Sequence, residues 1–148
     1  TILDSHGPEL ALGLEALPYM VKPNAAEAQE WAGFALDDDA ARWRAIECFH
    51  ARGVEMVVLS LGREGALVSR GGTRLRVTPP AIREVNPVGS GDALVAGFAI
   101  GLLEDMPMED MARLAVAAGT ANAMNWDIGH FTKEEVESLL PRVSMAKA

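Results

Sequence analysis

The segment 86–92 holds the residues whose types and spacing best fit a chemical site. Gly89 and Gly91 flank Ser90 just ahead of an apolar run that is typical of a helix. Glycine permits positive φ and lets a ligand approach the backbone closely, and the first N–H groups of a helix lack helical acceptors. Such groups can hold an anion and stabilise charge on a transferring phosphoryl group. Asp92, at the mouth of this anion hole, could accept a proton from an attacking hydroxyl.

The same residues also fit a plain glycine turn in which Asp92 caps a helix. The residues alone leave that alternative open. The segment is not a Walker A loop, because no Gly-Lys-Ser/Thr follows it. It is not a dinucleotide fingerprint either, because the third glycine is misplaced.

Two other segments could serve the same chemistry. Asn24 and Glu27 are three residues apart, which places both on one side of a first helical turn, and their oxygen atoms suit magnesium. They could equally be a helix cap and an exposed glutamate. The segment 60–65, Ser-Leu-Gly-Arg-Glu-Gly, could be no more than the turn that ends a strand. Lys22 and Arg63 could approach phosphate oxygens or remain solvated charges.

The elements that must position these residues alternate between strands and helices. Apolar, β-branched runs predict strands, periodic apolar faces predict helices, and Thr132 and Glu135 have capping-box spacing. This alternation predicts an α/β fold with a mainly parallel sheet, whose ligands lie beyond the carboxyl ends of the strands. Trp31, Trp43 and Trp126 are expected to pack from the helices. We predict strands at 2–4, 19–21, 54–61, 66–69 and 74–78, and helices at 9–16, 25–34, 40–52, 91–104, 108–126 and 132–140.

Composition and charge exclude several classes of function. The 148 residues, 49% of them hydrophobic and 23% charged, suffice for one globular domain. A formal net charge of −8 argues against nucleic-acid binding. The run 93–103 is too short to span a membrane. Cys48 is the only cysteine, so no internal disulfide forms, which fits a cytoplasmic location.

The chain opens on a strand without an initiator Met, and we expect it to be part of a longer protein.

The sequence Asn86-Pro87-Val88-Gly89-Ser90-Gly91-Asp92 closely resembles the second signature of the PfkB branch of the ribokinase superfamily, which usually has G-A-G-D at its centre. The resemblance implies that Asp92 is the catalytic base and that Gly89, Ser90 and Gly91 are the anion-hole residues. Ser90 replaces the more usual alanine, and a backbone role survives this change.

Three further elements carry the same resemblance. The segment 21–27 looks like the family's N-x-x-E element, which implies that Asn24 and Glu27 help to place Mg²⁺ and the ATP phosphates. Lys22, which could approach those phosphates, is our candidate for a nucleotide-binding residue in this segment. The segment 60–65 looks like the S-x-G-x-x-G turn near those phosphates, which implies Ser60, Gly62 and Gly65 as ATP-binding residues. Asn122 is implied to border the adenine, unless it is an ordinary amide on a helix surface.

The resemblance covers essentially the whole chain, but only the C-terminal half of the family's length. It implies a three-layer ribokinase-like fold in which residues 1–148 form the ATP-binding and catalytic part, without the N-terminal sugar-binding and lid part. Ile2-Leu3-Asp4-Ser5-His6-Gly7 and the segments 119–123 and 128–131 look most like the tagatose-6-phosphate kinase and 1-phosphofructokinase branch.

The resemblance implies a kinase that uses ATP and Mg²⁺ to phosphorylate a ketohexose phosphate: tagatose 6-phosphate, fructose 1-phosphate or fructose 6-phosphate. The full-length protein could form a homodimer. Two alternatives stay open. The chain could be a nucleotide-binding fragment without catalysis, or it could belong to a kinase for another sugar or a nucleoside.

Overall fold

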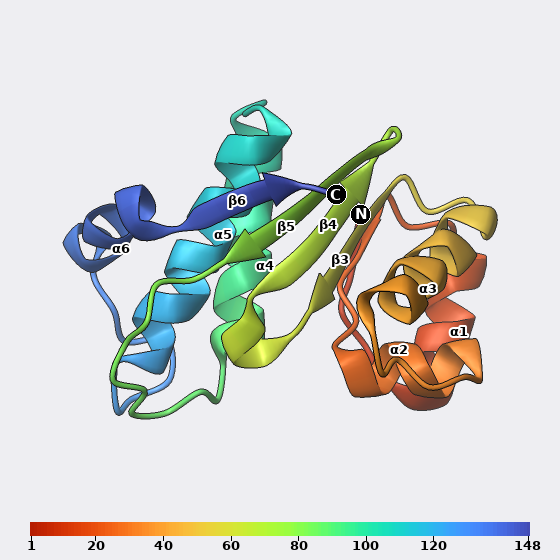
Figure 1. Cartoon of the computed structure of the whole chain (residues 1–148), viewed down its shortest axis with the longest axis horizontal. Coiled ribbons are helices and arrows are strands. Elements are labelled where there is room, and N and C mark those ends of the chain that lie inside the picture. The colour runs from red at the N-terminus through yellow and green to blue at the C-terminus, as the bar shows by residue number, and fades with distance from the viewer. The chain divides into compact units, whose positions relative to one another are not determined.

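The computed structural model describes all 148 residues and alternates strands with helices (Figure 1). The α/β prediction is confirmed. The strands are β1 (Ile2–Leu3), β2 (Met20–Val21), β3 (Met56–Ser60), β4 (Ala66–Arg70), β5 (Thr73–Thr78) and β6 (Ser144–Lys147). The α-helices are α1 (Gly7–Glu15), α2 (Ala25–Ala32), α3 (Asp39–Ala51), α4 (Ser90–Leu103), α5 (Met108–Ala123) and α6 (Lys133–Leu139), with short 3₁₀ turns η1 (Gly62–Glu64) and η2 (Leu140–Arg142).

The strands form a mixed sheet in the order β1-β2-β3-β4-β5-β6. β1 pairs with β2 and β2 with β3 in parallel, with Ile2 opposite Met20 and Met20 opposite Met56. β4 runs antiparallel to β3, with Ser60 opposite Ala66. Parallel neighbours need a crossover connection, which α1 supplies between β1 and β2, and α2 with α3 between β2 and β3. The short η1 turn between β3 and β4 can only reverse the chain. The expected parallel character therefore applies to β1, β2 and β3 and not to β4.

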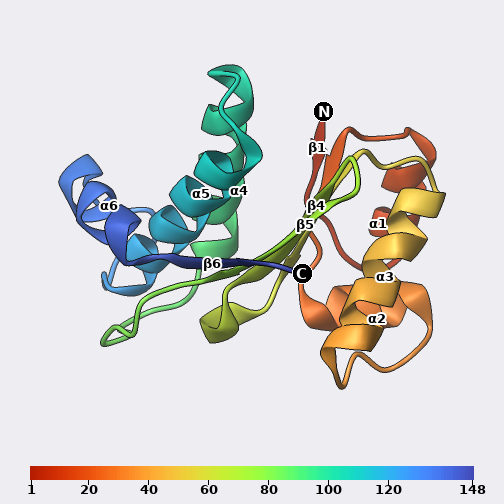
Figure 2. The ribbon, with the colours of Figure 1, turned by 45° about the horizontal axis from the view of Figure 1, so that its top comes forward.

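The chain divides into two compact units, and the first comprises residues 1–62, 66–75 and 147–148. Its three helices, α1, α2 and α3, gather on one side of β1, β2 and β3 (Figures 1 and 2). Their apolar core includes Val57 and Leu59 of β3 and Phe49 of α3. The Phe49 ring stacks on Trp31, with the ring centroids 4.0 Å apart. This core fixes the carboxyl ends of β2 and β3, where several predicted site residues lie.

The second unit comprises residues 63–65 and 76–146. In this unit α5 packs between α4 and α6 (Figure 2). α4 approaches α5 closely because Gly97 lies against the backbone of Ala115, where an added Cβ would overlap. This close packing sets the position of the amino end of α4, which carries the glycines and Asp92.

Most predicted boundaries lie within two residues of the observed ones. The helix predicted at 108–126 ends earlier, at Ala123, so Trp126 lies outside it with 77% of its surface exposed and does not pack as expected. Strand β6 was not predicted, because its residues Ser-Met-Ala-Lys have little β propensity. No helix of the structure combines the length and the apolar composition needed to cross a bilayer.

Candidate active site

The amino end of α4 is an open helix start. Gly89 is the N-cap, with φ 80° and ψ −3°, and no side chain caps the helix. Ala93 N donates to Gly89 O at 2.9 Å, and Ser90 N donates to Pro87 O at 3.1 Å. The N–H groups of Gly91 and Asp92, which lie between these donors, have no acceptor within the protein. Asp92 is exposed in this first turn, so the structure places a free carboxylate beside free N–H groups.

The glycine loop is held by the carboxyl end of α5. Val85 N and Asn86 N both donate to Ala123 O, at 2.8 and 3.2 Å. The Asn86 side chain donates to Trp126 O at 2.9 Å and accepts from Val88 N at 3.1 Å. The loop therefore enters α4 along a path fixed by hydrogen bonds at several points before Gly89.

Asn122 is the buried polar residue of this arrangement, with 1% of its surface exposed. Its Nδ2 donates to Val88 O at 2.8 Å and to Ser90 Oγ at 3.0 Å, and its Oδ1 accepts from Gly129 N at 2.8 Å. The alternative of a surface amide is thus wrong. Both amide hydrogens are used inside the protein, which leaves Asn122 no donor for a nucleotide.

In the first unit, Asn24 and Glu27 form a capping box at the start of α2. Asn24 Oδ1 accepts from Glu27 N at 2.9 Å, and Glu27 Oε2 accepts from Asn24 N at 2.8 Å. Both predicted metal ligands therefore also build the helix start, and Glu27 Oε1 remains available. No group of three or more His, Cys, Asp or Glu side chains is arranged to hold a metal ion.

Lys22 follows β2 and is buried, with its Nζ 3.1 Å from Asp4 Oδ1. It is therefore not a solvated surface charge. Asp4 follows β1, which runs parallel to β2, so the two side chains meet at the same edge of the sheet. Sequence reasoning placed Asp4 at a strand end but assigned it no role, because an ion pair between separate strands has no local signature.

The segment 60–65 reverses the chain through η1. Ser60 N donates to Pro23 O at 3.0 Å, which ties the end of β3 to the residue before Asn24. Gly62 is exposed, whereas Gly65 is buried with φ 90° and has no room for a Cβ beside Val77 O. The requirement for glycine at Gly65 is therefore structural, whatever its part in ligand binding.

Arg63 is paired within the second unit. Its Nε and Nη2 donate to the two carboxylate oxygens of Glu84 at 3.0 and 2.8 Å. These hydrogen bonds lower the pKa of Glu84 and raise the pKa of Arg63. The Arg63 side chain is 82% exposed, so Arg63 is a solvated surface charge that pairs with Glu84.

The predicted residues fall into two groups, one in each unit. Lys22, Asn24, Glu27 and Ser60 lie at or just beyond the carboxyl ends of β2 and β3, and Gly62 follows in η1. Gly89, Ser90, Gly91 and Asp92 lie at the start of α4, Asn122 contacts them from α5, and Gly65 lies beside β5.

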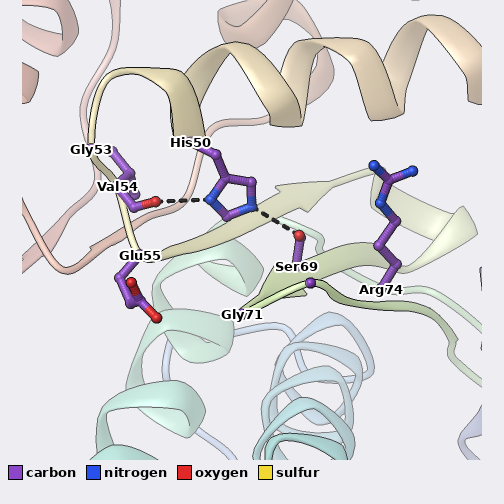
Figure 3. A pocket seen from close by; sticks show the side chains of 8 residues that line it. His50, Gly53, Val54, Glu55, Ser69, Gly71 and Arg74 are labelled. Carbon is purple, nitrogen blue, oxygen red and sulfur yellow. Dashed lines mark hydrogen bonds between the residues drawn. The ribbon is translucent and has the colours of Figure 1, made fainter.

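An open pocket of about 440 Å³ lies elsewhere in the first unit (Figure 3). His50 lies in it between two partners, with Nδ1 2.8 Å from Val54 O and Nε2 2.8 Å from Ser69 Oγ. Arg74, also in its lining, pairs with Glu47 at 2.5 Å. None of the predicted site residues lines this pocket, so it is separate from the candidate active site.

Comparison with known proteins gives a consistent result. A family model described as pfkB family carbohydrate kinase matches residues 1–125. The chain is 40% identical over 140 residues to a 1-phosphofructokinase of Xanthomonas campestris, a match that covers 91% of this chain and 44% of that protein. It is 32% identical over 148 residues to a tagatose-6-phosphate kinase of Staphylococcus epidermidis, covering 98% of this chain and 48% of that protein. The chain thus spans about half the length of the curated relatives it matches.

Solved structures show the same fold. Phosphofructokinase-2 of Escherichia coli in complex with potassium matches with a TM-score of 0.89 and 29% identity, covering 95% of this chain and 46% of that one. Ribokinase of Arabidopsis thaliana complexed with ribose and ATP matches with a TM-score of 0.82 and 26% identity, covering 94% and 46%. The expected ribokinase-like α/β fold is confirmed.

Proposed function

The chain belongs to the pfkB family of carbohydrate kinases, and from this membership we propose that the complete protein transfers a phosphoryl group from ATP to a ketohexose phosphate. The observation that carries the proposal is the open start of α4, where an exposed Asp92 adjoins two N–H groups without acceptors. The relatives named 1-phosphofructokinase and tagatose-6-phosphate kinase support the acceptor class. Fructose 1-phosphate, tagatose 6-phosphate and fructose 6-phosphate are the candidate acceptors.

In the proposed reaction, Asp92 accepts the proton of the attacking hydroxyl. The hydroxyl oxygen forms a bond to the γ-phosphorus of ATP while the bond to the bridging oxygen breaks, which gives ADP and a sugar bisphosphate. The N–H groups of Gly91 and Asp92 stabilise the charge on the transferring group. Gly89 supplies the turn that leaves these groups free, and Ser90 contributes its backbone to the same turn.

The residues at the end of β2 fit a supporting role toward ATP and Mg²⁺. Magnesium binds proteins through one or two carboxylates and keeps several waters and phosphate oxygens, and Glu27 Oε1 is a free carboxylate oxygen of this kind. We propose that Glu27 holds the ion directly or through water and that Asn24 keeps Glu27 in place. Lys22, Ser60, Gly62 and Gly65 complete the proposed nucleotide-binding set. The bound ion neutralises phosphate charge.

We further propose that residues 1–148 form the C-terminal ATP-binding and catalytic part of a longer kinase. The relatives are about twice as long as this chain. An additional N-terminal part would supply most sugar contacts and a lid, which excludes water from the reaction. Without that part, the chain would bind nucleotide and transfer nothing.

A coupled ADP-release assay tests the proposal, using the longest natural form of the protein with ATP and Mg²⁺. Each of the three sugar phosphates is compared with a blank that lacks sugar. Turnover with one of them supports the proposal and identifies the acceptor. Nucleotide binding by calorimetry without turnover would favour another acceptor or a binding-only chain, and the absence of both would contradict the proposal.

A further inference from the structure

The hydrogen bonds of Asn122 link two loops that are distant in sequence. Its amide group contacts Val88 and Ser90 at the start of α4 and Gly129 in the turn after α5. Every hydrogen of the amide has an acceptor, and the acceptors are 34 and 32 residues away along the chain. We infer that Asn122 is a positioning residue, which sets the conformation of the anion-hole loop rather than contacting the nucleotide.

Close packing also confines the loop on two sides. Gly89 has φ 80°, and an added Cβ would overlap the side chain of Ile128. Gly119, one turn before Asn122 in α5, has its Cα side against Ser90 O, where an added Cβ would lie 3.0 Å away. The loop therefore lies between α5 and the segment 128–129, and the Asn122 side chain, which comes from α5, bonds both to the loop and to Gly129.

The free N–H groups of Gly91 and Asp92 directly follow the residue that Asn122 holds. Their direction is set by the turn at Gly89 and Ser90, because successive peptide planes share the Cα between them. Loss of the bonds to Val88 O and Ser90 Oγ frees that turn. The effect of Asn122 on catalysis rests on the proposed kinase function, which this inference deepens. The effect of Asn122 on the loop does not depend on that function.

Asn122→Asp is the sharpest test, because it keeps the side-chain size and the acceptor for Gly129 N while it removes both donors. The carboxylate would face Val88 O with no hydrogen between them. Asn125→Asp is the matched control. Asn125 is also an amide at the end of α5, but its Nδ2 donates to Ala121 O at 3.0 Å and to Glu135 Oε1 at 3.3 Å, away from the loop.

Three readouts are measured on the longest natural form of the protein. Amide hydrogen exchange should become about tenfold faster in the segment 85–91 of Asn122→Asp, because a lost buried hydrogen bond lowers the cost of local opening. The turnover number kcat should fall on the order of a hundredfold, because small misplacements of the reacting geometry are costly. The KM for ATP should change by less than about threefold, because the groups that bind the nucleotide are still present.

The outcomes separate the inference from the proposed function. Unchanged exchange in 85–91, or faster exchange with an unchanged kcat, would overturn it, and so would an equal effect of Asn125→Asp. If the wild-type protein shows no kinase activity, the proposed function fails, and the exchange readout alone decides whether Asn122 holds the loop. If Asn122→Asp does not fold, Asn122→Ser takes its place, because it is small and carries no charge. Its hydroxyl is too short to replace the bonds of the amide, so exchange in 85–91 should again become faster, and no effect on exchange would overturn the inference.

Discussion

The ammonium group of Lys22 lies 3.1 Å from a carboxylate oxygen of Asp4, and this pair joins the ends of two parallel strands. The Lys22 side chain is 6% exposed and that of Asp4 is 31% exposed. If the pair is broken, water can therefore solvate the Asp4 carboxylate more easily than the Lys22 ammonium group. A buried ammonium that loses its partner is left uncompensated, whereas a half-exposed carboxylate is not.

This asymmetry predicts unequal effects of two substitutions. Asp4→Asn should lower the free energy of unfolding by about 1–3 kcal/mol, because it leaves a buried charge without its partner. Lys22→Met should cost less than about 1 kcal/mol, since it keeps the apolar stem and leaves Asp4 in contact with water. Urea denaturation of both variants measures the difference. Equal losses of stability in the two variants would contradict the conclusion that Lys22 is the buried partner of the pair.

Lys22→Met also tests the proposed contact with ATP. The KM for ATP should rise about tenfold if the ammonium approaches a phosphate, which corresponds to the loss of one charge-assisted hydrogen bond. Lys133→Met is the control, because Lys133 is 82% exposed and pairs with Glu137 on α6 at 3.6 Å. A KM equal to that of the control would assign Lys22 a structural role only.

The capping box of α2 allows charge to be removed from Glu27 without loss of its hydrogen bond. Glutamine can accept from Asn24 N as glutamate does, so Glu27→Gln should change stability by less than about 0.5 kcal/mol. The Mg²⁺ concentration for half-maximal turnover should rise about tenfold, because magnesium prefers a carboxylate. A magnesium titration of the wild type and the variant measures this shift.

The chain contains a matched control for this experiment. Glu135 forms the same capping box with Thr132 at the start of α6, with bonds of 2.7 and 3.2 Å. Glu135→Gln should therefore leave the magnesium titration unchanged, although it also loses the bond that Glu135 Oε1 accepts from Asn125 at 3.3 Å and can lower stability to that extent. An equal response of the two variants would mean that Glu27 acts only as a cap.

Asp92→Asn should lower kcat by about two to four orders of magnitude, because a general base contributes about that much to proton transfer. The substitution keeps the shape of the side chain and removes its basicity. Affinity for ATP, measured by calorimetry, should stay within about threefold, since Asp92 is proposed to act on the acceptor hydroxyl. Turnover near the wild-type value would exclude Asp92 as the base.

Gly89→Ala should damage both stability and turnover. The residue needs a positive φ, which costs about 1–2 kcal/mol for a residue with a Cβ, and the new methyl group would also overlap Ile128. Gly33→Ala is the control, because Gly33 has φ 75° but nothing within 4 Å of the added Cβ. Thermal melting should therefore show a larger loss for Gly89→Ala, and only that variant should lose turnover. Similar losses in both would indicate that backbone conformation alone is responsible.

Features that depend on residues close together in the chain could be predicted before the fold was known. The glycine and aspartate spacing predicted the start of α4 to within one residue, and the spacing of Thr132 and Glu135 predicted their capping box. The alternation of strands and helices predicted the α/β class, and the resemblance carried by 86–92 indicated the family. The start of α4 and the capping box could be read from the chain because the hydrogen bonds of a helix start join residues that are three or four positions apart.

The contacts between distant segments could not be predicted in this way. Lys22 pairs with Asp4 across two strands, and Asn122 bonds to Val88 from 34 residues away. Strand β6 was missed because its residues have little β propensity, and its conformation follows from its place in the sheet. Such contacts join residues that are distant along the chain and have no local pattern, so they become visible only when packing has placed the elements.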